Sequence, residues 1–173
     1  MKRFFLILLL LSAKVVSQNT LSGVLPLSSG KVSYKEVLEI PGQPKEILIV
    51  NARAWLIANN ASHVMEEELD EKHQIIKGKM SFKTLWGPND FPELYKEVQY
   101  NVKVTAKNTR YQYEFTNFIV KDPGKTSQLE IYKSEHKKND AYNHDFYVRI
   151  DKEVQKIIAS LLQKMNTPIE TEP

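Results

Sequence analysis

The stretch from Val98 to Val120 constrains the fold more than any other part of this 173-residue chain, because it has the pattern of a β-hairpin. Apolar and polar residues alternate on both sides of Asn108-Thr109, as in strands that bury one face. With these two residues as the turn, the predicted pairs are Lys107 with Arg110, Ala106 with Tyr111, Thr105 with Gln112, Val104 with Tyr113, Lys103 with Glu114, Val102 with Phe115 and Asn101 with Thr116. Apolar residues then meet only apolar partners. A shift of one residue would expose the whole apolar set, so the sequence specifies this register strongly.

A second hairpin is predicted from strands at 63–70 and 74–86, with Lys72-His73 as the turn. Its expected pairs are Leu69 with Ile76, Met65 with Met80, Glu68 with Lys77, Glu67 with Gly78 and Glu66 with Lys79. Two of these pairs place opposite charges directly across from each other, which contributes about 0.2 to 1 kcal/mol each. Glu67 falls on the core side by parity, so we expect it at the margin of the sheet.

Two helices are predicted outside these hairpins. The first has Pro44 in its first turn and ends at Asn59-Asn60, and the second is capped by Asp151 and ends at Asn166. The apolar stripe of the first helix consists of Ile47, Val50, Ala54, Ile57 and Ala61, with Leu48 and Trp55 alongside. That of the second consists of Val154, Ile157, Ile158, Leu161, Leu162 and Met165. We expect both stripes to lie on the sheet.

A further strand, Val32 to Ile40, precedes the first helix and ends at the turn signal Pro41-Gly42. The predicted fold class is therefore α+β in the order β-α-β-β-β-β-α. Its antiparallel sheet has about five strands, with both helices on the apolar face and the charged face outward. Asp122-Pro123-Gly124 is expected to end the sheet, and Leu129, Ile131 and Tyr132 fit a short strand or turn.

The first 17 residues resemble a signal peptide, because Lys2 and Arg3 precede an apolar run that is too short to span a membrane. We expect export to the periplasm or beyond the cell, a loose lead-in at 18–30, a single domain at 31–166 and a frayed tail at 167–173. Residues 134–147 are dense in charge and fit a mobile surface loop. The chain has no cysteine, which excludes disulfides, thiol catalysis and thiolate metal sites.

The net charge of the chain does not favour an anionic partner once the leader is set aside. The formal net charge is +3, but three of the 24 basic residues and none of the 21 acidic ones lie in the leader. The remainder is formally neutral, so composition gives no argument for binding nucleic acid or an anionic membrane.

Motifs for catalysis fail or are absent. Gly124-Lys125-Thr126 lacks the earlier glycine of a phosphate-binding loop, and neither a Gly-x-Ser-x-Gly nor a His-Glu-x-x-His sequence is present. A divalent metal is an open alternative at the polar cluster Glu135, His136, Asp140, His144 and Asp145, although its spacing matches no common ligand pattern. The acidic run Glu66, Glu67, Glu68 and Asp70 is a weaker candidate for calcium, because strand alternation points neighbours to opposite faces. No catalytic, cofactor-binding or metal-binding residue is assigned.

The outer face of the sheet is the best candidate surface for a ligand or partner. Its lysines are Lys77, Lys79, Lys83, Lys103 and Lys107. Four acids, Glu66, Glu68, Asp70 and Glu114, share that face and largely offset the lysines, so an ordinary solvated face of mixed charge is the competing interpretation.

Several short segments resemble a known family: Leu25-Pro26-Leu27, Gly30-Lys31-Val32, Ala54-Trp55-Leu56, Ile76-Lys77-Gly78-Lys79 and the closing helix. The chain is similar over 25–165 to a domain of unknown function with a TBP-like (TATA-box-binding-protein-like) fold, found in exported bacterial envelope proteins. The resemblance implies the fold and an exported setting, and brings no catalytic residues. We therefore expect a non-enzymatic binding or assembly domain whose partner is an envelope protein or ligand and not nucleic acid. The alternative is a metal-dependent or hydrolytic enzyme that uses residues 135–145.

Overall fold

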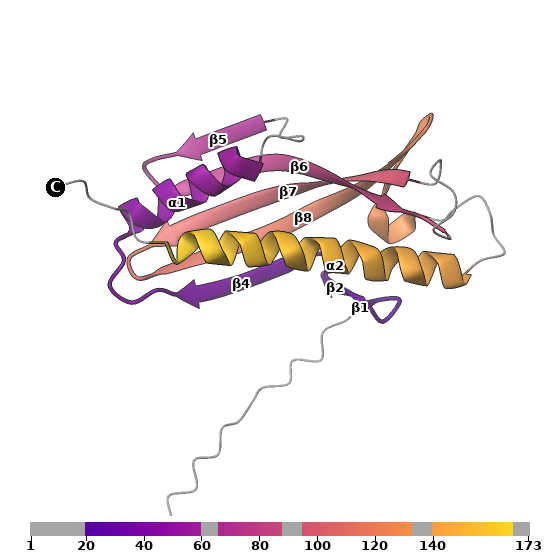
Figure 1. Cartoon of the computed structure of the whole chain (residues 1–173), viewed down its shortest axis with the longest axis horizontal. Helices are drawn as coiled ribbons and strands as arrows, with labels where there is room; N and C mark the ends of the chain where they lie inside the picture. The colour runs from indigo at the N-terminus through magenta and orange to yellow at the C-terminus, as the bar shows by residue number, and fades with distance from the viewer. Residues whose placement is uncertain (1–19, 60–65, 88–94, 133–139, 168–173) are drawn as a thin grey trace, which may run out of the picture.

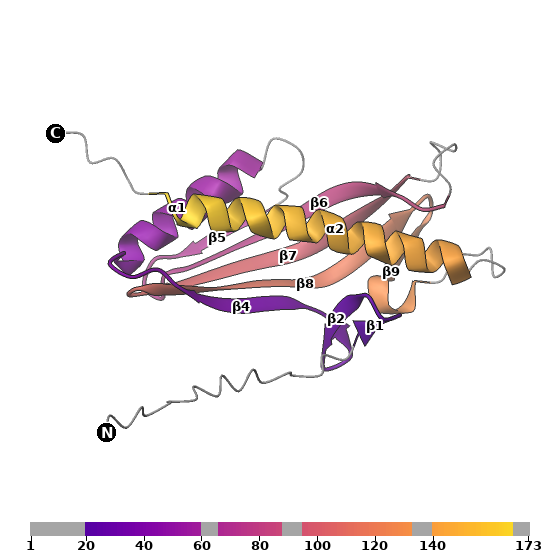
Figure 2. The same ribbon diagram turned by 60° about the horizontal axis from the view of Figure 1, so that its bottom comes forward.

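A computed structural model describes residues 20–59, 66–87, 95–132 and 140–167. Two helices cover one face of an antiparallel six-stranded sheet, which is the expected α+β class (Figures 1 and 2). The main elements are β4 (Tyr34–Glu39), α1 (Lys45–Ala58), β5 (Glu66–Asp70), β6 (Ile75–Leu85), β7 (Tyr95–Lys107), β8 (Arg110–Asp122), β9 (Lys125–Gln128) and α2 (Asp140–Met165). The strand order is β4-β8-β7-β6-β5, and β9 also pairs with β8. The predicted signal peptide (1–17) lies outside the described residues, as does the tail from 168 onward.

The β7–β8 hairpin has the predicted register. Every pair from Lys107↔Arg110 to Asn101↔Thr116 is present, and the apolar members are buried against the helices. In the β5–β6 hairpin the pairs Glu68↔Lys77 and Leu69↔Ile76 are confirmed, together with the Glu66 and Glu67 pairs. Met65, expected opposite Met80, lies outside the described residues. Local alternation was therefore sufficient to place these four strands.

A bulge in β8 changes the register beyond Asn101. Gln99 pairs with Ile119, so β8 has one residue more than β7 between the two flanking pairs. Asn117 takes the extra position in the left-handed conformation, with φ of 56°. The bulge shifts the buried parity of β8 by one residue, so Phe118 is buried as well as Phe115, and Phe118 stacks on Tyr100 with ring centroids 5.5 Å apart. In a regular strand, residues three positions apart point to opposite faces. The two apolar phenylalanines at this spacing are therefore the sequence signal for the bulge.

The turn of the β7–β8 hairpin holds a β-branched residue in a disfavoured conformation. Thr109 has φ of 63°, where β-branched residues are outliers. Its backbone accepts a 2.7 Å hydrogen bond from the Ile40 amide and donates one to the Gln43 carbonyl, so its conformation is anchored on both sides.

Thr109→Gly is expected to stabilise the protein by about 1 kcal/mol, because relief of strain outweighs the extra chain entropy of glycine. Both backbone hydrogen bonds survive the substitution. The midpoint of thermal unfolding should rise by about 2–4 °C, which calorimetry measures. Thr109→Val, equally β-branched, is the control and should give no increase. A lower midpoint for the glycine variant would contradict the prediction.

The segment expected to be a loose lead-in is ordered structure from Thr20 onward, which corrects the prediction for 18–30. It forms β1 (Thr20–Leu21) and β2 (Leu25–Ser28), and β2 pairs with both β1 and β3 (Lys31–Val32) in a small three-stranded sheet. Leu25 and Val32 are fully buried. The Val32 amide donates to the Glu130 carboxylate at 2.7 Å, a contact between residues far apart in the chain. The order of this segment therefore comes from packing, which its local composition does not indicate.

The face of α1 that meets the sheet differs from the predicted one. Leu48 and Trp55, predicted alongside the stripe, are buried together with Ala52 and Leu56. Val50 and Ile57, from the centre of the predicted stripe, are 52% and 50% exposed. The helix is apolar on two sides, so periodicity alone did not decide which side the sheet would cover. Trp55 donates to Ser160 Oγ at 2.9 Å, and the Asn51 amide donates to the Thr167 carbonyl. These two hydrogen bonds, to α2 and to the residue that follows it closely, fix the rotation of α1 about its own axis.

α2 begins at Asp140, eleven residues before the predicted start at Asp151, so the expected loop at 134–147 is wrong over its second half. Residues 134–139 of that loop lie outside the described residues. Phe146 and Ile150 are buried, and Trp86 contacts this first half of α2 through a 3.2 Å hydrogen bond to Asn143. Tertiary packing thus stabilises turns whose own sequence is rich in charge.

The sheet also continues past Gly124, where the sequence predicted its end. The chain turns there and returns as β9, which pairs with β8 from Ile119↔Gln128 to Asp122↔Lys125. A single 3-10 turn, η3 (Leu129–Ile131), follows and buries Leu129, which agrees with the turn alternative expected there and not with the short strand.

Candidate functional site

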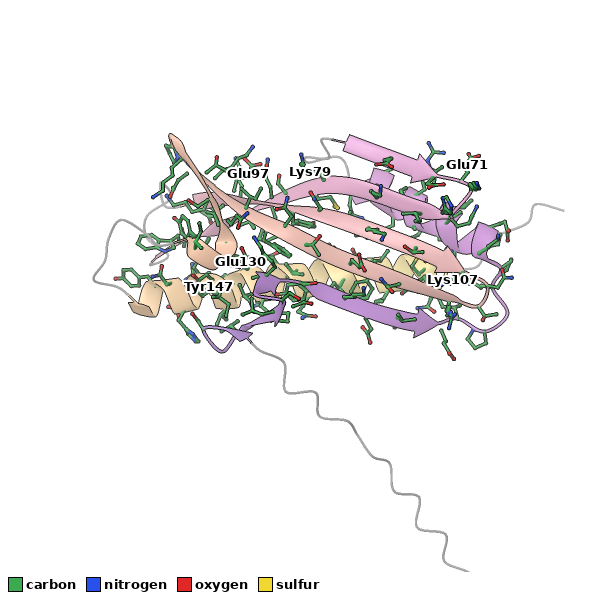
Figure 3. The ribbon with its side chains drawn as sticks, turned by 180° about the vertical axis from the view of Figure 1, so that it is seen from behind. Glu71, Lys79, Glu97, Lys107, Glu130 and Tyr147 are labelled. Carbon is green, nitrogen blue, oxygen red and sulfur yellow. The ribbon has the colours of Figure 1, made fainter. Side chains whose placement is uncertain are left out.

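The outer face of the sheet is the surface that the helices leave uncovered (Figure 3). The register across β5, β6, β7, β8 and β4 aligns five charged residues in one row: Glu68, Lys77, Lys103, Glu114 and Lys35. The pairing of β4 with β8 brings Lys35 into this row. Sequence reasoning missed Lys35, although the alternation of Tyr34, Leu38 and Ile40 with polar residues placed it on the outward parity.

Ion pairs hold most of this charged row together. Lys77 Nζ lies 2.9 Å from a Glu68 oxygen, and Lys35 Nζ lies 2.6 Å from Glu114 Oε1. Lys103 Nζ lies 3.8 Å from the other oxygen of Glu114. Lys77 and Lys103 face each other directly, a repulsive arrangement that the flanking carboxylates offset. The row is therefore a fixed arrangement of positive and negative side chains, and neither sign dominates along its whole length.

Glu114 is the electrostatic centre of the row. Its hydrogen bond with Lys35 is the largest influence on it, and together with Lys103 and Gln112 it holds the pKa of Glu114 below the usual 4.5 despite partial burial. The Gln112 amide donates to the same carboxylate at 2.6 Å. Glu114 is therefore ionised throughout the neutral range and positions two lysines.

Glu114→Gln is expected to lower the free energy of unfolding by about 1 kcal/mol at neutral pH, since both lysines lose their partner. The folded-state pKa is depressed, so this stabilisation is present above about 4.5 and is lost as pH falls through the folded-state pKa. The difference between the two proteins should shrink below that pH. Urea unfolding across the acidic range measures it, with Glu71→Gln in the exposed turn as control. If the two free energies of unfolding differed by the same amount at every pH, the lowered pKa of Glu114 would be contradicted.

A shallow hollow of about 380 Å³ lies on this face, and four residues of the charged row line part of it. Its lining includes Lys77, Lys79 and Lys103 together with Asn101 and Thr116. Of the five lysines expected to share one surface, the structure thus gathers three. Lys83 lies in a separate groove between the end of β6 and α2. Lys107 lies at the end of the β7–β8 hairpin, away from Lys79 (Figure 3).

The two candidate ion sites acquire no further support. Asp70 receives hydrogen bonds from the backbone and ring of His73, and these lower its pKa. That pair closes the β5–β6 turn. His144 and Asp145 are both exposed, and as neighbours on a helix they point in different directions. No group of three possible metal ligands occurs among the described residues, from which 133–139 are missing.

Two buried tyrosines form polar contacts that the sequence did not indicate. The Tyr34 hydroxyl donates to Asp151 of α2 at 2.8 Å, and the Tyr113 hydroxyl donates to Glu36 at 2.9 Å. Burial and the adjacent carboxylates raise the pKa of both tyrosines. They are therefore fixed hydrogen-bond donors that position β4, β8 and α2, not proton acceptors. Their partners lie far away in the chain, so no local pattern marks them.

Comparison with known proteins identifies the family. A model for the domain of unknown function DUF4468, with TBP-like fold, matches residues 34–121, about half of the chain and most of its sheet. The chain belongs to the DUF4468 family. The resemblance on short segments is thereby confirmed, and the family description states a fold without an activity. No curated protein matches the chain.

Solved structures of bacterial proteins show the same DUF4468 fold. A TBP-like protein from Parabacteroides distasonis is 18% identical, with a TM-score of 0.65 over 83% of this chain and 97% of the other. A DUF4468 family protein from Bacteroides ovatus is also 18% identical, with a TM-score of 0.62 over 88% and 96%. At this identity the likeness shows the fold alone. Within the described residues, neither helix has the length and apolarity needed to cross a membrane.

Proposed function

We propose that this DUF4468 protein is a non-enzymatic binding or assembly domain that is exported to the bacterial cell envelope and binds an envelope protein or ligand through the outer face of its sheet. The observation that supports the proposal most directly is the charged row from Glu68 to Lys35. It is held in register by five strands and is covered by neither helix.

A rigid pattern of mixed charge suits recognition better than catalysis. Each side chain of the row is held by its neighbours, so a partner with the complementary pattern meets preorganised charges. Uncovered and partly paired charges provide register and specificity more than affinity. The hollow adds polar groups, Asn101 and Thr116, which can donate and accept hydrogen bonds.

Export is supported by the N-terminal sequence. Lys2 and Arg3 precede an apolar run of the length found in signal peptides, and the absence of cysteine makes the fold independent of the redox state of its compartment. Pulse labelling in a bacterial host tests export. Replacing Leu8 and Leu9 by arginine should leave the unprocessed precursor in the cytoplasm, and normal processing of that variant would contradict export.

The binding proposal is tested by capture from detergent-solubilised envelope of a bacterium that encodes the protein. The test variant carries Lys79→Glu and Lys103→Glu on the outer face. A matched control carries Lys72→Glu and Lys107→Glu, which make the same change in charge at exposed positions in or beside the two hairpin turns. Both variants are first compared with the native protein by thermal unfolding. A partner retained by the control and lost by the folded test variant supports the proposal, and equal capture by all three contradicts it.

The enzymatic alternative, built on residues 135–145, is tested separately with metals. Binding of zinc or calcium to a specific site stabilises the folded state by about 2.7 kcal/mol at a hundredfold excess over the dissociation constant. Thermal unfolding that is unchanged by either metal argues against that alternative. Stabilisation that is lost in a His144→Ala variant would favour it over the binding proposal.

A further inference from the structure

A second candidate surface lies on the helical side of the molecule, between α2 and the end of β6. It is a groove of about 470 Å³, separate from the outer-face hollow. One wall is Lys83 to Leu85 of β6, with Tyr95 at the start of β7. The other wall is one flank of α2, which contributes Arg149, Lys152, Glu153 and Lys156. Arg149 donates to the Leu85 carbonyl at 3.3 Å and joins the two walls.

The groove has an excess of positive charge. Four cations line it, three from α2 and Lys83 from β6, against one carboxylate, that of Glu153. Glu153 is already paired with Lys156 at 2.7 Å. Glu97 faces Lys83 across the β6–β7 pairing, and one of its oxygens accepts a hydrogen bond from Gln99. The groove thus has a local excess of cations in a protein whose formal charges nearly cancel.

Along this groove, β6 pairs with no described strand on one of its two sides. β5 pairs with β6 only from Ile75 to Lys79, so from Met80 to Leu85 the strand has β7 on one side and no described strand on the other. An open edge offers backbone hydrogen-bonding groups to an added strand. Recognition of an extended peptide by strand addition uses such an edge for affinity and the neighbouring side chains for specificity.

The arrangement of the cations favours an extended chain over a small anion. Arg149 and Lys156 are separated by two turns of α2, about 10 Å along the helix axis. A small anion would reach only part of this line. A peptide in strand conformation places every second side chain on one side at a repeat of about 7 Å, so acidic residues at alternate positions would follow the line of cations. Tyr95, 53% exposed, adds an aromatic side chain to the lining of the same groove.

We propose that the groove between β6 and α2 binds an extended acidic peptide, which adds to the open edge of β6 and directs alternate carboxylates toward Arg149, Lys152 and Lys156. The site is distinct from the outer face, so its success or failure is independent of the function proposed above.

Fluorescence anisotropy with the full-length protein tests this site. The probe is a labelled decapeptide of alternating glutamate and valine. Lys152→Ala with Lys156→Ala should weaken binding about tenfold, because two charge contacts are lost while alanine preserves the helix. The matched control, Lys72→Ala with Lys107→Ala, removes two exposed cations elsewhere and should bind as the native protein does. Equal weakening in both variants would overturn the proposal, since general charge attraction would then explain binding.

Two further measurements separate the proposal from misfolding and from other ligands. Glu153→Gln should tighten binding about threefold, because it removes the carboxylate of the groove and releases Lys156; a damaged fold would not bind more tightly. A decapeptide of alternating glutamate and proline has the same charge but lacks half of the amide donors, so it should bind about tenfold more weakly. Equal affinity for that peptide would overturn strand addition. Tighter binding to phosphatidylglycerol vesicles, lost in the Lys152/Lys156 variant, would overturn the peptide in favour of a membrane.

Discussion

Val102→Asp should leave the protein unfolded, whereas Asn101→Asp, one residue away, should change its stability by no more than about 0.5 kcal/mol. Val102 is 2% exposed and lies between Gly78 and Phe115 in the register of the sheet. Replacing it removes about 1.5–3 kcal/mol of apolar burial and places a carboxylate in the core at a cost of several kcal/mol more. Together these losses approach the whole stability of a typical domain, about 5–15 kcal/mol.

Asn101 faces the other side of the same strand. It is partly exposed beside Lys79 and Thr116, where a carboxylate remains in contact with water. Circular dichroism and urea unfolding of the two variants measure the difference. Similar stability for both would contradict the alternation of β7, and with it the assignment of the outer face.

Leu56→Ala should lower the free energy of unfolding by about 2–5 kcal/mol, while Ile57→Ala should change it by less than about 0.5 kcal/mol. The two residues are neighbours on α1 with side chains of similar volume. Leu56 is 1% exposed and packs in the core, so its truncation leaves a cavity, whereas Ile57 is 50% exposed. Alanine also has the higher helix propensity, which offsets the small loss at Ile57.

This pair of substitutions tests the rotation of α1 over the sheet. Chemical denaturation gives both free energies under the same conditions. A large loss at Ile57 with a small one at Leu56 would restore the apolar stripe predicted from the sequence and contradict the structure. Comparable losses at both positions would indicate that a second surface covers the exposed stripe, for instance in an oligomer, which sedimentation would detect.

The strands illustrate how much of the fold local sequence determines. Alternation in β7 and β8 has a period of two, and only one register places every apolar residue opposite another. Glu68 and Lys77 were paired by the same reasoning, and their side chains lie 2.9 Å apart. Lys77, Lys79 and Lys103 were likewise placed on one side of β6 and β7, because the side of a strand on which a residue lies follows from its parity.

The candidate site as a whole needed tertiary structure. The row from Glu68 to Lys35 depends on β4 pairing with β8, and those strands are separated in the chain by a helix and three strands. The basic groove combines Lys83 with Lys152 and Lys156, about seventy positions away. No local sequence pattern indicates that residues so far apart in the chain lie together. The outward parity of Lys35 was visible in the sequence, but its neighbours in space were not.

By itself the sequence determined the α+β class, the two hairpins and their register, since these depend on interactions between residues close in the chain. The tertiary structure decided which side of α1 is buried, because that helix is apolar on two sides and only packing against the sheet and α2 selects one. It also decided that α2 begins at Asp140 and that Leu25 and Val32 belong to the core. In each case the stabilising contacts come from distant residues, and their free energy exceeds the weak preferences of the local sequence.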